Sequence, residues 1–409
     1  MRILYLSACI AFSVFNAPGQ LRAEQLTLDQ AVKLALEVNP MLEIQRQIVA
    51  EARAERLSRS LLPNPLLTYN REELELTEAG GGEWILAAEM PLDFIWRRGP
   101  LLSEAEASIE AENYGLAALR EQVRLETSLA YIETHFGRQE LQARQRSSEI
   151  LQEIREKSRV LKSEGDMSGY DQRRITFEVF RSRRDQVLAE NALGESEKKL
   201  NLLVYQDSLS RKVETVESFP KQLPELSAER LVATALERRA DLKRSRTRIS
   251  ALRAAVQAAK RGALPGLGVS LGYKRQVDGF EGPVGYFNLR LPLFDRNQGA
   301  VAGNQARLNA GEVTVAAQER QITAEVETAC QNYLRLREQL AEYRANMLDN
   351  PELLIETASF SYLEGEVSLV EWIDAVRTYT EDAVIRFGLL RDCYLSLYRL
   401  ELLTGGDLH

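Results

Sequence analysis

The chain carries the same sequence pattern twice, about 200 residues apart. Residues 26–42 read LTLDQAVKLALEVNPML and residues 226–242 read LSAERLVATALERRADL, with leucine, valine and alanine at matching places. Solenoid repeats are only about 20–50 residues long, so each copy here must be a half-molecule of several helices and strands. The duplication therefore predicts two similar halves around an axis of pseudo-symmetry.

The composition narrows the classes of protein that fit. The 409 residues, 44% apolar and 27% charged, suffice for two ordinary domains. Aromatic residues make up only 7%, and the abundant Ala, Leu, Glu, Gln and Arg are typical of long helices in water. The net charge of -8 argues against a nucleic-acid partner. Basic clusters such as 238–248 alternate with acids at helical spacing, which favours a solvated helix face.

Residues 1–23 are predicted to be a signal peptide. The apolar stretch Ile3–Phe15 is followed by small-residue cleavage sites, so we expect export and a mature chain that starts near Glu24. Leu6–Cys9 resembles a lipobox, and lipidation of Cys9 is the alternative. Cleavage at that point leaves an apolar core shorter than the roughly 7 residues that a signal needs, which argues against it.

Each half is predicted to contain a helix, a β-hairpin and a long helical hairpin, from the change between apolar periods of 3.6 and 2. In the first half, residues 24–206, these elements are expected at 27–61 with an interruption at Pro40, about 66–92, and about 97–203. In the second half, residues 225–404, they are expected at 227–263, about 268–293 with a turn at 278–283, and about 299–403. Residues 207–224 are predicted to be a linker and 405–409 a tail.

The four predicted strands have the length that crosses a bilayer when tilted, about 8–11 residues. Val269, Leu271 and Tyr273 alternate with polar or small residues, as in an amphipathic strand. Four strands cannot close a barrel, and an open sheet edge cannot face lipid, so several chains would have to pool their strands. The alternative is that both hairpins belong to a soluble domain.

The order of these elements, the stretches LPNPLL (62–67) and PLFDRNQG (292–299), and the paired Gly-x-x-Ser turns together resemble the TolC-type outer-membrane factors. The second stretch is similar to the heavy-metal branch typified by CzcC and CusC. The resemblance implies a mainly α homotrimer, with a barrel of 12 strands, four from each of three chains, in outer-membrane lipid, continued by an α-helical periplasmic tunnel. It implies a passive channel without cofactors that receives substrate, here metal cations, from an inner-membrane RND-type transporter through a periplasmic adaptor.

The resemblance also implies roles for the two turns of the helical hairpins. The adaptor-contact residues map to these turns, at Gly165, Ser168, Asp171, Gly365 and Ser368. The glycines permit the turns, and the serines are expected to cap the helices that follow.

The family's periplasmic aperture maps to Tyr362, Glu371 and Asp374. Carboxylates three residues apart share a helix face, and rings of them attract cations. The alternative is a solvated acidic pair that favours the helix dipole. Two departures stand out: Val367 occupies a position that is basic in TolC, and Arg174 replaces the second acid in the first copy.

Aromatic residues of the predicted strands are expected to form an interfacial girdle, and they are Tyr69, Trp84, Tyr273, Tyr286 and Phe287. Trp96 is expected at the inner membrane boundary. The alternative is aromatic packing at the joint between strands and helices.

An enzyme is not expected, because the two histidines, His135 and His409, accompany no nucleophile or phosphate-binding pattern. Two His, three Cys and five Met form no metal-binding motif. Cys330 and Cys393 are expected to be buried, unpaired thiols. The competing classes are a periplasmic coiled-coil adaptor and, among channels, a conduit for organic compounds or type I protein secretion.

Overall fold

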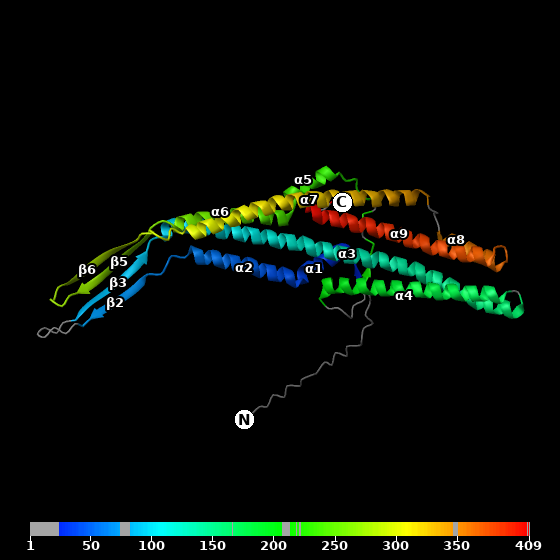
Figure 1. Ribbon diagram of the computed structural model, residues 1–409. Helices are drawn as coiled ribbons and strands as arrows, with labels where there is room; N and C mark the ends of the chain where they lie inside the picture. Colours follow the sequence, from blue (N-terminus) through cyan, green and yellow to red (C-terminus); the bar gives the residue numbers. More distant parts are fainter. Residues whose placement is uncertain are drawn as a thin grey trace, which may run out of the picture. The chain divides into compact units, whose positions relative to one another are not determined.

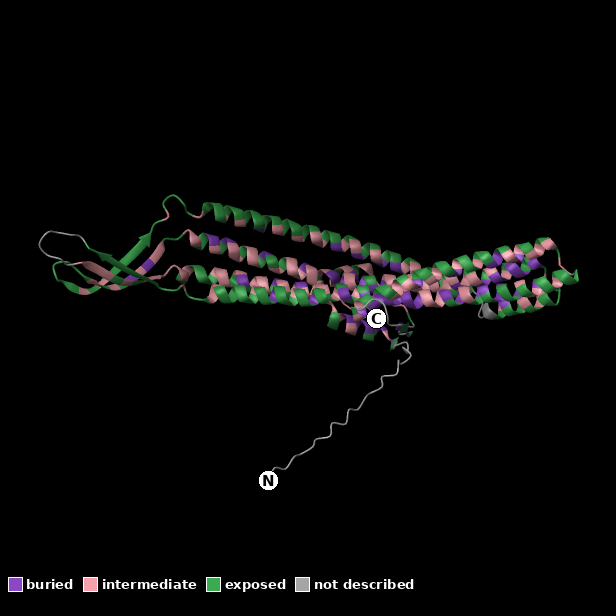
Figure 2. Cartoon of the chain, turned by 90° about the horizontal axis from the view of Figure 1, so that it is seen from below, coloured by how far each residue is buried: buried purple, intermediate pink, exposed green. Residues whose placement is uncertain are grey.

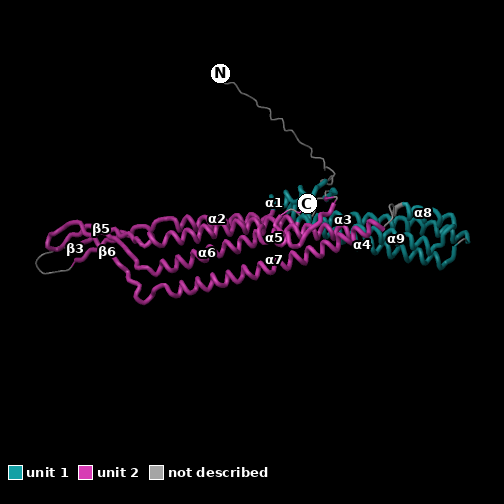
Figure 3. The backbone as a smooth tube through the Cα atoms, turned by 90° about the horizontal axis from the view of Figure 1, so that it is seen from above, with its two compact units in different colours: residues 1–38, 127–219, 349–388 teal, residues 39–126, 220–348, 389–409 magenta. Residues whose placement is uncertain are grey.

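The computed structural model describes residues 24–73, 82–165, 167–206, 213–217, 219–220, 222–346, 351–406 and 408. The chain divides into two compact units (Figure 3): unit 1 comprises 1–38, 127–219 and 349–388, and unit 2 comprises 39–126, 220–348 and 389–409. Each unit therefore contains segments of both sequence repeats.

The helix that opens the first repeat is interrupted at Pro40, as predicted (Figure 1). Helix α1 spans Leu28–Val38 and α2 spans Pro40–Ser60. Between them, Asn39 Oδ1 accepts a hydrogen bond from the Met41 backbone N–H at 2.9 Å. Proline suits the first helical position because that position needs no N–H donor.

The corresponding helix of the second repeat is also divided, and the prediction of one continuous helix over 227–263 was wrong. Helix α5 spans Ala228–Arg238 and α6 spans Ala240–Gly262. No proline marks the break at Arg239, whose guanidinium binds Asp241 at 2.7 Å. Gly405, at φ 71°, packs so close that a Cβ there would lie 3.2 Å from the Arg238–Arg239 backbone. This close approach explains why residue 405 is glycine.

A short parallel sheet lies in unit 1, where the sequence predicted only a linker. Strand β1 (Glu24–Leu26) pairs with β4 (Val213–Thr215), which falls within the expected linker 207–224. The Tyr131 hydroxyl lies 2.6 Å from the carbonyl oxygens of both Leu26 and Val216. Three-residue strands carry no periodic signal, which explains why the sequence pattern missed them.

The second sheet, in unit 2, consists of the two predicted hairpins. Strands β2 (Leu66–Glu72), β3 (Glu83–Pro91), β5 (Gly266–Arg275) and β6 (Glu281–Arg290) are antiparallel in the order β2-β3-β5-β6. The β5–β6 turn is tighter than the expected 278–283. Its glycine, Gly279, has φ 90°, and Pro283 lies within β6 opposite Tyr273. Most of the first predicted turn, 79–82, lies outside the described residues.

Long helices form the rest of the chain. Helix α3 (Phe94–Glu164, 71 residues) and α4 (Gly169–Tyr205) form the first predicted helical hairpin. The second helical hairpin consists of α7 (Gln298–Asn346), α8 (Pro351–Leu363) and α9 (Leu369–Thr404). No described helix has an apolar run that could cross a membrane.

Each unit has its own apolar core, which Figure 2 shows as buried helix faces. The unit 1 core joins α3, α4, α8 and α9 and contains Ile150, Leu151, Ile154, Ile175, Val179, Ile355, Leu369, Trp372, Ile373, Val376 and Tyr379. The unit 2 core joins α5, α6, α7 and the end of α9, and includes Cys330. Cys330 and Cys393 are buried and free, as predicted.

Candidate membrane sheet and channel entrance

The β2-β3-β5-β6 sheet has one apolar and one polar face. Residues directly opposite each other in the register share a face. The apolar face carries Leu67, Tyr69, Trp84, Leu86, Ala88, Met90, Leu267, Val269, Leu271, Tyr273, Phe287 and Leu289, and at its hairpin-turn end the charged Arg71, Arg275 and Glu281. The other face is mostly polar: it carries Thr68, Asn70, Glu72, Glu83, Glu89, Ser270, Lys274, Tyr286, Asn288 and Arg290, together with the apolar Leu66, Ile85, Ala87 and Val284. Leu67 and Leu271 are 68% and 69% exposed, so no described residue covers these side chains of the apolar face.

Four of the five aromatic residues assigned to the girdle, Tyr69, Trp84, Tyr273 and Phe287, lie on the apolar face. The Trp84 ring centroid lies 6.5 Å from that of Tyr69 and 6.1 Å from that of Tyr273. Tyr286 is on the polar face, because adjacent residues of a strand point to opposite sides and Phe287 is on the apolar one. Its assignment to the girdle was therefore wrong. Trp96 lies in the first turn of α3, half-buried.

Both predicted hairpin turns lie in unit 1 and have the expected local structure. Gly165 and Gly365 have φ 94° and 78°, the left-handed region that glycine favours. Ser168 Oγ accepts a hydrogen bond from the Asp171 N–H at 3.0 Å and donates to its carboxylate at 2.6 Å. The prediction that Ser168 caps α4 is confirmed.

Ser368 and Glu371 form a capping box at the start of α9. Glu371 N–H donates to Ser368 Oγ at 3.4 Å, while the Ser368 N–H and hydroxyl both donate to Glu371 Oε2 at 2.8 Å. The backbone hydrogen bond, followed by the hydroxyl, lowers the pKa of Glu371 and favours its ionised form. Glu371 and Asp374 are both exposed, so each carboxylate is accessible to solvent.

Tyr362 links the two turns of unit 1. Its ring stacks on Trp372 at 5.3 Å between centroids, with 21° between the planes, and it packs on the same core as Met167. Trp372 is fully buried and its Nε1–H donates to Ser359 Oγ at 3.1 Å. Burial, and secondarily the Asp171 charge, raises the pKa of the Tyr362 hydroxyl. Of the three predicted aperture residues, Tyr362 is thus the one held within the core.

An ion pair that the sequence analysis did not identify joins α4 to α9. Arg377 Nε donates to Glu178 Oε2 at 3.3 Å, and its Nη2 donates to Oε1. The Glu178 side chain is only 8% exposed. A cavity of about 320 Å³ beside the pair is lined by α3, α4 and α9. No sequence motif marks this pair, because its partners lie about 200 residues apart.

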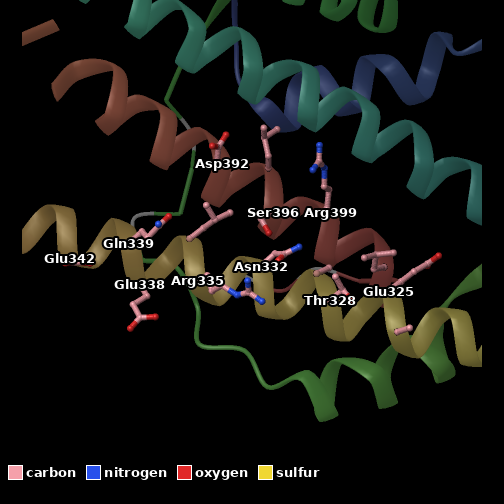
Figure 4. A pocket seen from close by; sticks show the side chains of 15 residues that line it. Glu325, Thr328, Asn332, Arg335, Glu338, Gln339, Glu342, Asp392, Ser396 and Arg399 are labelled. Carbon is pink, nitrogen blue, oxygen red and sulfur yellow. The ribbon is translucent and has the colours of Figure 1, made fainter. Parts of the chain in front are cut away.

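A larger groove of about 1110 Å³ runs between α7 and α9 in unit 2 (Figure 4). Its polar lining has both signs of charge, with Arg335 and Arg399 among Glu338, Glu342 and Asp392. Within the described part of the chain, no group of three or more His, Cys, Asp or Glu residues could hold a metal ion. Neither the cavity beside Glu178 and Arg377 nor this groove therefore resembles a metal centre.

Comparison with known proteins agrees with this architecture. The family model for outer membrane efflux proteins matches residues 231–406. The chain is 20% identical over 385 residues to the cobalt-zinc-cadmium resistance protein CzcC of Cupriavidus metallidurans, covering 94% of this chain and 91% of that one. Among solved structures it resembles the outer-membrane channel OprN (TM-score 0.76, 18% identity, 93% and 90% covered) and CusC (0.74, 18%, 93% and 92%).

The fold is that of the TolC-type channels, which combine a barrel with a helical tunnel. With the family match over residues 231–406, the chain is similar to outer-membrane efflux channels, a family of passive conduits and not of enzymes. The resemblance inferred from the duplicated elements is confirmed, including its similarity to CzcC and CusC.

Proposed function

We propose that three copies of this chain form the outer-membrane channel of a tripartite efflux system that passively conducts metal cations to the exterior. An inner-membrane RND-type pump and a periplasmic adaptor would deliver the substrate. The observation that carries this proposal is the four-stranded sheet, which has an exposed apolar face, a polar face and two open edges.

The open edges require partners. Strands β2 and β6 are the two edges of the sheet, and unpaired backbone groups cannot remain in lipid.

Ion pairs between neighbouring helices of unit 2 follow the same order as the strands, α2-α3-α6-α7. Arg56–Glu106 joins α2 to α3, Glu112–Arg244 joins α3 to α6, and Arg246–Glu319 joins α6 to α7, at 2.7, 2.8 and 2.7 Å. Further copies of the chain can close both the row of strands and the row of helices. Three copies supply 12 strands.

The proposed substrate class rests on the entrance and on one relative. Glu371 and Asp374 are exposed on one face of α9, and the lowered pKa of Glu371 keeps it negative. Threefold symmetry turns the pair into six carboxylates, which attract cations and disfavour anions. CzcC, which is similar along 94% of this chain, is described as a cobalt-zinc-cadmium resistance protein.

Fractionation tests the assembly. The full-length protein should remain in the outer-membrane fraction after a carbonate wash and run as a trimer in mild detergent. Release as a soluble monomer would instead favour the periplasmic adaptor class.

Deletion of the gene tests the substrate. Tolerance to one or more of zinc, cobalt, cadmium, copper and silver should fall and should return when the gene is restored. Unchanged tolerance to all five, with sensitivity to organic compounds or loss of a secreted protein, would favour the two alternative channel functions.

Planar bilayers test the entrance. Glu371→Gln combined with Asp374→Asn should change the single-channel conductance and weaken blockade by divalent cations, because the negative ring is lost. Unaltered cation selectivity would contradict the assignment of these two residues.

A further inference from the structure

Helices α2 and α7 are the outer helices of the row α2-α3-α6-α7 in unit 2. The middle contact of this row joins the long helix of the first repeat, α3, to the short helix of the second, α6. There Glu112 binds Arg244 at 2.8 Å and Arg248 at 3.0 Å. When further copies close the row, α7 of one copy meets α2 of the next, which again joins a long helix to the short helix of the following repeat.

The sequence repeat relates these two contacts residue by residue. The pairs Gly99 and Gly299, and Gly165 and Gly365, give an offset of 200 residues between α3 and α7. Helices α2 and α6 begin at residues 40 and 240, with the same offset. The contact between α3 and α6 within the chain is therefore a template for a contact between α7 and α2 of different copies.

Burial marks the face of α7 that this template assigns to a neighbouring copy. On α3, the residues that share the face of Glu112 at spacings of three and four are buried or half-buried, and they are Leu102, Ala105, Ile109, Glu112 and Leu116. Their equivalents on α7 are all exposed, and they are Ala302, Gln305, Asn309, Glu312 and Ala316. A seam with this spacing is the part of a helix that a partner helix covers. The seam is covered in the first repeat and bare in the second.

Helix α2 shows the same difference from α6. Four residues of α6 on the face of Arg244 are half-buried, and they are Asp241, Arg244, Ala251 and Ala255. Their equivalents on α2 are exposed, and they are Met41, Ile44, Glu51 and Glu55. The equivalent of Arg248 is Ile48. Met41, Ile44 and Ile48 are 54%, 52% and 38% exposed and form one stripe, which indicates a surface that binds a partner.

We propose that α2 of one copy packs against α7 of the next, with Ile44 and Ile48 beside Glu312 and Ala316. The contact between copies is then apolar on the α2 side, where the contact within the chain is ionic. Glu312 keeps a partner, because Arg253 of its own α6 binds it at 3.0 Å. This inference rests on the proposed channel function, since it names the helices that join the copies.

The other half of the seam is also complementary. Helix α3 starts at the β-sheet and α6 ends at it, so the template contact is antiparallel. Residues late in α2 therefore meet residues early in α7, which places Glu51 and Glu55 near Gln305 and Asn309. Amide N–H groups can donate to these carboxylates. The apolar half and the polar half together select one direction and one level for the two helices.

Cross-linking tests the seam directly in the full-length protein. Ile44→Cys combined with Ala316→Cys should form disulfides between copies, seen as dimers and trimers on non-reducing gels. Ile44→Cys combined with Ala317→Cys is the matched control. Ala317 is an exposed alanine one residue further along α7, about 100° around the helix, and should cross-link little. The native Cys330 and Cys393 are buried and free in all variants.

Charge at residue 48 gives a second readout. Ile48→Glu places a carboxylate beside Glu312 of the next copy, and the yield of trimer should fall by about tenfold because like charges oppose association. Ile48→Arg loses the same apolar side chain but restores the Arg–Glu chemistry of the template, and its yield should stay within about twofold of the wild type. Ala50→Glu, which adds the same charge on the opposite, exposed face of α2, is the control and should assemble normally.

The results separate this inference from the proposed function. Equal trimer yields from Ile48→Glu and Ile48→Arg, or equal cross-linking at residues 316 and 317 in a wild-type-like trimer, would overturn the seam. A wild-type protein that forms no oligomer in the outer membrane would instead overturn the proposed function.

Discussion

At the scale of single residues, the same side chain can serve local structure and function together. Glu371 completes a capping box with Ser368 and also belongs to the proposed entrance ring. The two interpretations of this acid, a helix-start residue and an aperture residue, therefore do not exclude each other. Asp171 repeats the capping contact in the other turn.

Glu371→Gln should loosen the first turn of α9 and remove its pH dependence. The pKa of Glu371 is lowered in the fold, so its stabilising contribution is present above the ordinary value near 4.5 and is lost as pH falls through the lowered pKa. Hydrogen-exchange protection factors of residues 369–372 should show that decline in the wild type and be flat in the variant. Glu381→Gln, which removes an exposed acid of the same helix outside the capping box, should retain the wild-type decline.

His135 should make unit 1 less stable in mild acid. It is 6% exposed and packs edge-on against the rings of both Phe136 and Phe219, at 5.1 and 5.2 Å between centroids. Burial, assisted by the charge of Arg138, lowers its pKa below 6.5, so the unfolded chain binds the proton more readily and stability falls as pH drops below about 6.5. Thermal midpoints between pH 5 and 8 should show a steeper decline for the wild type than for His135→Gln. Parallel pH profiles would contradict this assignment.

At the scale of elements, the α8–α9 hairpin depends on one aromatic contact. Trp372→Ala should destabilise unit 1 by about 3–5 kcal/mol, the usual cost of truncating a buried Trp, because it also removes the Tyr362 stack and the hydrogen bond to Ser359. Chemical unfolding followed by circular dichroism measures the change. Phe180→Ala is the matched control, since Phe180 is 68% exposed in the same unit and should change little.

The elements themselves were predictable to different degrees. Pro40 marked the α1–α2 break in the sequence, whereas no proline or glycine marks the α5–α6 break at Arg239. The long amphipathic strands β5 and β6 were predictable from alternation. Strand β4 was not, because three residues show no period and their partner is β1.

At the scale of the whole molecule, the two faces of the sheet predict which substitutions block membrane assembly. Phe287→Arg places a charge on the apolar face, where a lipid-facing arginine costs about 2–4 kcal/mol at mid-membrane. The yield of heat-resistant trimer in outer membranes should fall sharply. Asn288→Arg, one residue further on the polar face, is the control and should assemble normally. Equal yields from both variants would contradict the assignment of the faces.

The sequence by itself determined the duplication, the strand and helix classes and the capped turns, because each depends on contacts within a few residues or on a repeated pattern. Only the tertiary structure decided that Glu178 meets Arg377 and that β4 pairs with β1. Those facts depend on register between segments far apart in the chain. Local periodicity specifies which face of an element is apolar, but only packing fixes which residue of a neighbouring element lies opposite.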